Sequence, residues 1–198
     1  MKRLLVAATL AASLAFTSLA NAAADPAAAK TFVDTVATQV LTLVKNDSLS
    51  KDAKQAQIEA IFSDKVDINF VAKFVLGKSW RTATPQQQQD YIAAYKPFIL
   101  KNYASKLTKY SGQTYTLKNA RVEGDDNVVT MEIDDPNGQK VNVDYHLRND
   151  TGSFKIVDIA VEGVSLLTTQ RSEFNGIVEN KGVDGLTAAL KAQVAAKE

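Results

Sequence analysis

The clearest pattern in this chain is a regular alternation of apolar and polar residues over 141–161, in two halves joined by a short polar turn. Side chains alternate between the two faces of a strand, so the apolar residues of the first half share one face: Val143, Tyr145 and Leu147. We predict a β-hairpin in which Tyr145 lies opposite Val157 and Val143 lies opposite Ile159. A slip of one residue would turn the apolar residues of the second half to the polar face.

The same period of two begins near Thr114 and continues through this hairpin. Clusters of Gly, Pro, Asn and Asp interrupt it at 124–126, 136–138 and 150–152. The segments between them are predicted strands, at about 114–123, 127–134, 140–149 and 153–161. Links this short join antiparallel neighbours, so we expect an antiparallel meander.

The first half of the chain follows a period of about 3.6 instead, which predicts helices. Their starts carry capping residues: Asp25 with Pro26, Ser50, and Thr84 with Pro85. We predict helices over about 26–45, from 50 to beyond 62, over 68–76 and over 85–110, and a helical hairpin after the strands at 165–180 and 184–197. Pro97 should kink the long helix without splitting it.

Helices followed by a strand meander are typical of an α+β protein. We predict a twisted antiparallel sheet of about four strands in the C-terminal half, packed against several helices as an NTF2-like cone with a helical extension. The 198 residues suffice for one core, and no repeat or low-complexity linker divides them. Residues 23–198 are therefore expected to form a single domain.

The first residues follow a different pattern. A basic start, Met1-Lys2-Arg3, precedes an apolar run that ends at Ala20-Asn21-Ala22, which fits the A-x-A cleavage pattern. We interpret 1–22 as a signal peptide that is cleaved after Ala22. A membrane anchor is the alternative, but the apolar run is shorter than the ~20 residues that span a bilayer.

Composition disfavours several classes of protein. Removal of Lys2 and Arg3 with the leader changes the formal net charge from +1 to −1, which argues against a general nucleic-acid binder. The absence of cysteine excludes disulfides and thiol chemistry, so stability must come from burial. A metal site built from several His or Cys ligands is disfavoured, because His146 is the one histidine.

Candidate acid–base chemistry is confined to the predicted hairpin. His146 could act as a general base, and Asp144 would lie opposite Asp158, close enough to share a proton. We favour structural roles, because nearby basic residues neutralise the carboxylates and no nucleophile motif accompanies the histidine. The doublets Asp125-Asp126 and Asp134-Asp135 lack a calcium-loop pattern and are interpreted as turns.

The remaining candidates are apolar and aromatic side chains. They include the valines of the hairpin and a group of aromatic residues: Trp80, Tyr91, Tyr95, Phe98, Tyr103 and Tyr145. Such stripes are usually core, and periodicity alone leaves open whether they enclose a ligand.

Several short motifs follow one another along the mature chain. They include Phe74-Val75-Leu76-Gly77, the segment 80–85, the segment 103–115, Val143-Asp144-Tyr145, Asp158, the segment 162–166 and the segment 181–186. Together they resemble the MlaC or toluene-tolerance family, the soluble periplasmic component of the Gram-negative Mla phospholipid transport system.

The resemblance implies a monomeric, non-enzymatic periplasmic carrier without a cofactor, which holds phospholipid acyl chains between the sheet and the helices. It would exchange lipid between an outer-membrane lipoprotein–porin complex and an inner-membrane ABC transporter, and so maintain outer-membrane lipid asymmetry. Carried onto this sequence, the pocket wall is Val143, Tyr145, Leu147, Val157, Ile159, Val164 and Leu167, facing Leu76, Trp80, Tyr91, Tyr95 and Tyr103. Charged residues at its rim would dock on the membrane partners, with these candidates: Arg81, Arg148 and Arg171.

Two other classes stay open beside the carrier. One is a periplasmic enzyme on a sheet-and-helix cone of the ketosteroid-isomerase kind, which would use Asp144, Asp158 or His146. The other is a periplasmic chaperone or adaptor that binds protein and holds no lipid.

Overall fold

The structure is a computed structural model that describes residues 25–108, 112–149 and 152–196. The predicted signal peptide at 1–22 and two residues of the predicted turn, Asp150 and Thr151, lie outside the described residues. The elements in chain order are α1 Pro26–Val44, α2 Lys51–Lys65, α3 Ile68–Leu76, α4 Lys78–Thr82, α5 Pro85–Leu107, β1 Thr114–Glu123, β2 Asp126–Asp134, β3 Lys140–Arg148, β4 Lys155–Val161, β5 Val164–Ser165 and α6 Leu166–Ala195.

The predicted α+β class is confirmed, with a sheet of five strands rather than about four. The strands pair in sequence order, β1-β2-β3-β4-β5, and every neighbour is antiparallel, as the short turns require. The additional strand, β5, has two residues and pairs with the end of β4 through Val161 and Val164. Sequence alternation did not indicate β5, because two residues are too few to show a period.

The predicted register of the β3–β4 hairpin is wrong. Tyr145 pairs with Ile159 rather than Val157, and Val143 pairs with Val161 rather than Ile159. The link between the strands is longer than three residues, and a bulge beside His146 places an extra residue in β4. The two changes shift the pairing by two residues, so Tyr145 and Ile159 still share a face. The predicted pairing of the two aspartates is also wrong, because Asp144 lies opposite Ala160.

The helix starts match their sequence signals. Asp25 accepts a hydrogen bond from the Ala28 amide at 2.9 Å, and Pro26 occupies the first turn of α1. Thr84 and Gln87 form the reciprocal capping box at the start of α5. Helix α5 continues through Pro97 as one element, as predicted.

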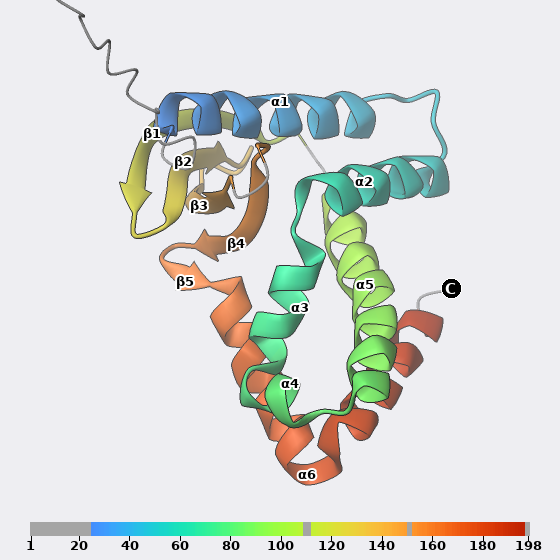
Figure 1. Ribbon diagram of the computed structural model, residues 1–198. Coiled ribbons are helices and arrows are strands. Elements are labelled where there is room, and N and C mark those ends of the chain that lie inside the picture. Colours follow the sequence, from blue (N-terminus) through green and yellow to red (C-terminus); the bar gives the residue numbers. More distant parts are fainter. Residues whose placement is uncertain (1–24, 109–111, 150–151, 197–198) are drawn as a thin grey trace, which may run out of the picture.

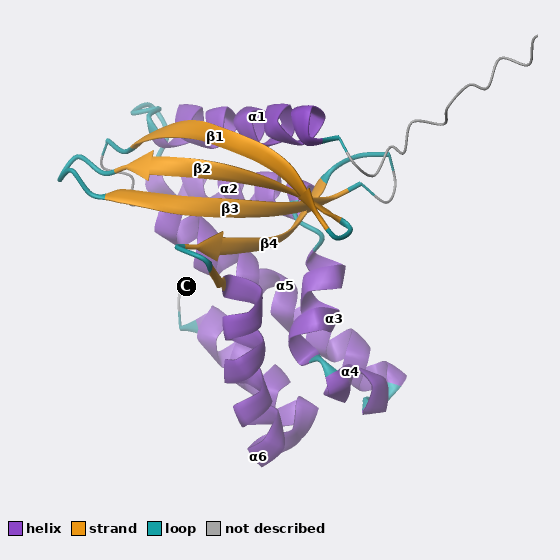
Figure 2. Ribbon diagram, turned by 90° about the vertical axis from the view of Figure 1, so that its left-hand side faces the viewer, coloured by secondary structure: helices purple, strands orange, loops and turns teal. Residues whose placement is uncertain are grey.

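The chain forms a sheet layer and a helical layer (Figure 1). Helix α1 lies along one face of the sheet, and α3, α5 and α6 pack together beyond the β4 edge. Figure 2 shows the sheet in front of α1 and α2, with the other face toward the viewer. That face carries ion pairs, since Lys118 and Lys140 each lie 2.9 Å from a carboxylate oxygen of Glu132.

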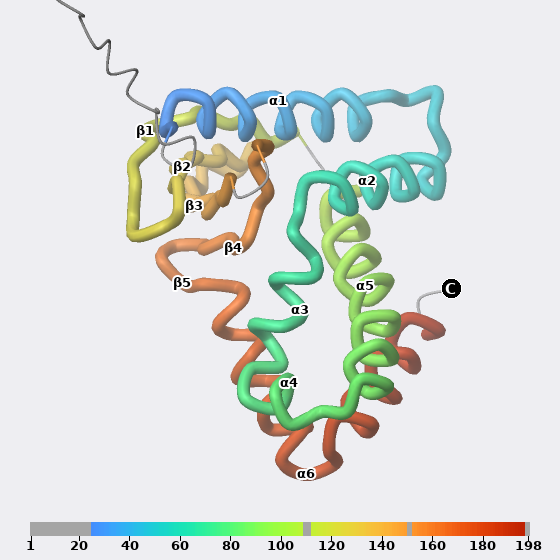
Figure 3. The backbone as a smooth tube through the Cα atoms, in the orientation of Figure 1, coloured from blue at the N-terminus to red at the C-terminus, as the bar shows by residue number. Residues whose placement is uncertain are grey.

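Helix α6 is a hairpin of two helical segments. Gly182, with φ 68° and ψ −179°, breaks the helical backbone, and the tube in Figure 3 reverses within α6. The positive φ favours glycine, because it has no Cβ to clash with the backbone. The returning segment packs Val183, Leu186 and Leu190 into the helical core.

Three hydrophobic clusters hold these layers. The first lies between α1 and the sheet and contains Ala29, Val33, Val129, Met131, Leu147 and Ile156. The second fills the helical layer and includes Leu76, Tyr91, Tyr95, Phe98, Leu167, Phe174 and Leu186. A smaller cluster joins α1, α2 and α5 through Val44, Ile58 and Ala104. In the part of the chain that the structure describes, no helix has the length and apolarity needed to cross a membrane.

Candidate binding cavity

An unfilled space of about 390 Å³ lies where the three clusters approach one another. Its walls come from α1, α2, the end of α5, the first four strands and the start of α6. The side chains that line it are mostly apolar: Val33, Val36, Ala37, Val40, Leu41, Val44, Phe62, Tyr103, Lys106, Leu107, Gln113, Thr114, Tyr115, Met131, Ile133, Tyr145, Ile156, Ile159 and Leu166.

One stripe of α1 forms the wall opposite the sheet. Its members recur at helical spacing, so they share one face: Val33, Val36, Ala37, Val40, Leu41 and Val44. Val33 packs in the cluster against the sheet, whereas Val44 packs in the cluster with Ile58. The helix is thus anchored near both ends of the stripe, and the residues between line the space.

Lys106 and Thr114 are the exposed residues among the described lining, and Gln113, next to Thr114 in sequence, is half-buried. We therefore place the mouth of the cavity at these residues. The Lys106 ammonium lies 5.5 Å from the centre of the Tyr103 ring one turn earlier on α5. Deeper in the cavity, burial raises the pKa of Tyr145 to about 12, which keeps its phenol neutral.

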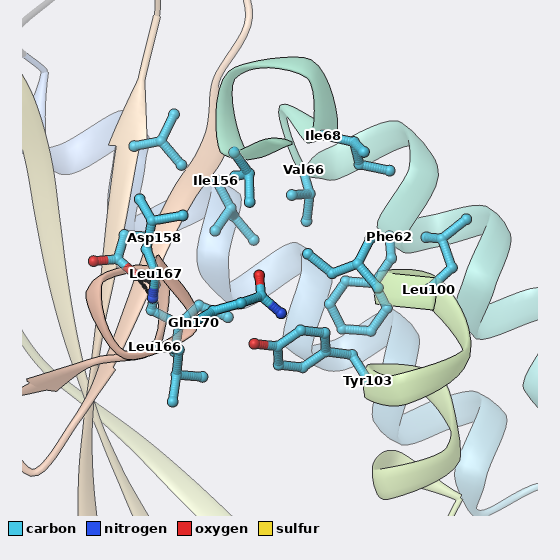
Figure 4. Close-up of a pocket in the computed structure, with 14 residues that line it drawn as sticks. Phe62, Val66, Ile68, Leu100, Tyr103, Ile156, Asp158, Leu166, Leu167 and Gln170 are labelled. Carbon is cyan, nitrogen blue, oxygen red and sulfur yellow. Dashed lines mark hydrogen bonds between the residues drawn. The ribbon is translucent and has the colours of Figure 1, made fainter. Parts of the chain in front are cut away.

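A second cavity of about 50 Å³ lies between the sheet and the helical layer (Figure 4). Its walls come from α2, α3, α5, β4 and α6. Three polar side chains are among its described lining residues: Tyr103, Asp158 and Gln170, whose Oε1 accepts a hydrogen bond from the Tyr95 hydroxyl. The Asp158 carboxylate is already bonded to Ser165 and to the Leu167 amide.

The structure divides the residues expected at a pocket wall into three groups. Tyr103, Tyr145 and Ile159 line the larger cavity, and the smaller cavity adds Val157 and Leu167. Val143 and Leu147 are buried on the expected sheet face but border neither cavity. The rest lie elsewhere: Val164 is 59% exposed, and the helical cluster contains Leu76, Trp80, Tyr91 and Tyr95.

The α1 wall was missed as a site by sequence reasoning. The regular stripe of valines on α1 was visible, but a stripe of this kind reads equally as core. Whether this stripe of α1 is core or cavity wall depends on whether other side chains fill the space in front of it, and only the tertiary structure shows that.

The three arginines proposed for docking occupy different settings. Arg81 is exposed near the end of α4. Arg148 donates from Nε to Asp126 at 2.6 Å, and its guanidinium lies 4.5 Å from the Phe70 ring centre. Arg171 stacks over Phe74 at 5.0 Å. Arg148 and Arg171 therefore also pack on the aromatic residues of α3.

The candidate acid–base residues do not converge on the larger cavity. Asp144 is held by Arg121 and Thr130, and His146 Nδ1 lies 3.5 Å from the Asp126 carboxylate. Among the lining residues that the structure describes there, none is a carboxylate or a histidine. Within the described ranges, no group of three or more His, Cys, Asp or Glu residues is placed to hold a metal ion.

The fold and cavity define an α+β protein that encloses an apolar space between a sheet and helices. The family model described as MlaC protein matches residues 34–192, and the chain belongs to this family, which confirms the resemblance seen in its motifs.

Two curated relatives are similar over part of their length. The intermembrane phospholipid transport system binding protein MlaC of Haemophilus influenzae is 25% identical over 131 residues, which cover 64% of this chain and 61% of that protein. The toluene tolerance protein ttg2D of Pseudomonas putida is 27% identical over 129 residues, with 64% and 60% covered. The matched region thus spans about three fifths of each relative.

A solved structure matches more of the chain. The phospholipid-binding protein from Ralstonia solanacearum, determined in complex with a phospholipid, is similar with a TM-score of 0.74 and 26% identity. The match covers 88% of this chain and 99% of that one.

Proposed function

We propose that this protein is a phospholipid carrier that holds acyl chains in the larger cavity. The observation that carries the proposal is an apolar space of about 390 Å³ whose exposed lining residues, Lys106 and Thr114, are polar. The names of the Haemophilus influenzae relative and of the Ralstonia solanacearum structure support the ligand class.

The cavity provides what lipid transfer through water requires. Exposure of an acyl chain costs about 0.8 kcal/mol per methylene, so two chains of about 16 carbons cost over 20 kcal/mol. An apolar pocket offsets this cost, whereas the phosphate of the headgroup can stay hydrated. Lys106 is the cation among the described lining residues, and we place the phosphate beside it at the mouth.

The wider role follows from the family. We propose that the mature protein works in the periplasm without enzymatic activity, and exchanges lipid between an outer-membrane complex and an inner-membrane ABC transporter. Its contribution would be to maintain outer-membrane lipid asymmetry. Arg81, Arg148 and Arg171 remain the proposed docking residues, through weak and salt-sensitive contacts that let the carrier leave again.

Native mass spectrometry of the purified mature protein, followed by organic extraction, tests the carrier proposal. We expect a mass increment that dissociates as phospholipid and a matching phospholipid in the extract. Protein purified without lipid that also fails to take up phosphatidylglycerol from vesicles would overturn the proposal. A ligand-free protein that turns over a small molecule would favour the enzyme, and one that captures unfolded protein would favour the adaptor.

A further inference from the structure

The two cavities are separated by a thin wall of shared side chains. Five residues border both spaces: Phe62, Tyr103, Ile156, Ile159 and Leu166. Ile156 and Ile159 belong to β4, Leu166 begins α6, and the two aromatic members belong to helices, so regular structure holds the backbone of all five. The aromatic members are Phe62 on α2 and Tyr103 on α5, whose ring centres are 6.2 Å apart.

The Tyr103 ring is not fixed in this wall by its hydroxyl. Other described tyrosines are tied by their hydroxyls: Tyr91 donates to the Ala72 carbonyl at 3.1 Å, and Tyr115 donates to Asp34 at 2.9 Å. In the described part of the chain, the Tyr103 hydroxyl has no hydrogen-bond partner, and the residue is half-buried. Figure 4 shows its ring beside Phe62, with the hydroxyl directed toward Gln170.

The space behind Tyr103 suits the end of a hydrocarbon chain. Most of its walls are apolar, with Val66, Ile68, Val71, Ile99, Leu100 and Leu167 beyond the shared residues. A volume of 50 Å³ holds about two groups of the size of a water molecule, which occupies about 30 Å³ in the liquid. The smaller cavity therefore admits a terminal methyl and methylene, and rotation of the Tyr103 ring would enlarge the path.

We propose that the smaller cavity is an end pocket for the methyl terminus of an acyl chain, and that Tyr103 determines how long a chain the protein accepts. The inference rests on the proposed carrier function and adds a chain-length determinant to it. Tyr103 acts as a partition because its side chain borders both cavities. The phosphate remains at the mouth, since Lys106 borders the larger cavity and not the smaller one.

Competitive loading tests the proposal. The full mature protein is incubated with vesicles that contain equal amounts of phosphatidylglycerols with monounsaturated chains of different lengths, from short to long, and the bound species are quantified by native mass spectrometry. Tyr103→Ala should raise the ratio of the longest to the shortest bound lipid at least about fourfold, the factor for one methylene moved out of water. Tyr103→Phe keeps the ring and should leave the ratio at the wild-type value.

A second substitution separates the end pocket from a general loosening of the site. Val71 lines the smaller cavity only, so Val71→Phe should fill it. Combined with Tyr103→Ala, it should return the chain-length ratio to the wild-type value. Tyr103→Leu replaces Tyr103→Ala if the alanine variant lacks a cooperative melt, and should shift the ratio in the same direction.

The outcomes distinguish this inference from the carrier proposal. If the wild-type protein loads phosphatidylglycerol but neither Tyr103→Ala nor Tyr103→Leu changes the ratio, the end pocket is wrong and the carrier stands. A shifted ratio that Val71→Phe fails to reverse also overturns the end pocket. If the wild-type protein loads no lipid, the carrier proposal itself fails.

Discussion

The carboxylate of Asp158 on β4 accepts a hydrogen bond from the backbone amide of Leu167, in the first turn of α6, at 3.1 Å. The same carboxylate accepts from the Ser165 hydroxyl and from the Ile159 amide. A negative charge at a helix start is favourable, because the first amides of a helix lack partners and the helix dipole is positive there. Asp158 thus joins the sheet to the helical layer beside the smaller cavity.

Asp158→Ala should destabilise the protein by about 2–3 kcal/mol, because it leaves partly buried amides without a charged acceptor. Ser165→Ala removes one of these bonds together with the side-chain cap of α6, and should cost about 1 kcal/mol. Urea unfolding followed by circular dichroism measures both variants. An Asp158→Ala variant within about 0.5 kcal/mol of the wild type would show that the carboxylate does not hold α6 to the sheet.

The surroundings of the Asp144 carboxyl should make the stability of the protein depend on pH. Partial burial by itself would raise the pKa of this carboxyl, but hydrogen bonds from Thr130 and Arg121 outweigh burial and hold the pKa below its ordinary value. A lowered folded-state pKa gives stability that is present above the unfolded pKa of about 4 and is lost as the pH falls through the folded value.

Asp144→Asn should therefore be less stable than the wild type at pH 7, by about 1–2 kcal/mol, and the difference should shrink as the pH is lowered below about 4. Urea midpoints at neutral and acidic pH measure this change. A difference that stays constant with pH would contradict the assigned role of the charge. Asp47→Asn offers an exposed carboxylate for comparison.

The strands were predictable because alternation and turn residues both mark them. The register between β3 and β4 could not be predicted, because the bulge beside His146 leaves no signature in the pattern of apolar and polar side chains. Tyr95 and Tyr103 show why the cavity could not be predicted from the sequence either. Both lie on one stripe of α5, but α6 fills the space beside Tyr95, whereas the space beside Tyr103 stays open. Periodicity identifies a buried face without showing what occupies the volume in front of it.

Charge reversal of the proposed docking residues should affect stability unequally. Arg148→Glu would place a carboxylate beside Asp126 and remove the stacking on Phe70, so we expect a loss of about 1–2 kcal/mol. Arg81→Glu should change stability by less than about 0.5 kcal/mol, because the described structure gives Arg81 no hydrogen bond or ion pair. Thermal melts of the two variants check this order.

Arg81→Glu is consequently the cleaner test of docking. Reduced cross-linking to membrane partners by this variant, with an unchanged melt, would support a docking role. Equal melts for both variants would contradict the structural role given to Arg148.

Ile133 and Leu147 provide a matched pair that separates cavity from core. They lie on the same face of neighbouring strands, but Ile133 is half-buried and lines the larger cavity, whereas Leu147 is fully buried in the cluster beneath α1. A glutamine at Ile133 has unfilled space for its amide, so the unfolding free energy should fall by about 1 kcal/mol or less. The same amide in the path of an acyl chain would be left without hydrogen-bond partners when lipid binds, which should weaken loading about tenfold or more.

Leu147→Gln should give the opposite result. A polar amide in a filled cluster has no partner and no room, so we expect a loss of several kcal/mol of stability. Lipid content per folded molecule should stay near the wild-type value, because Leu147 borders neither cavity. Urea unfolding and phospholipid content, measured on the same preparations, distinguish the two residues. Equal destabilisation by both substitutions, or an unchanged lipid load in Ile133→Gln, would mean that the space beneath α1 is not the lipid site.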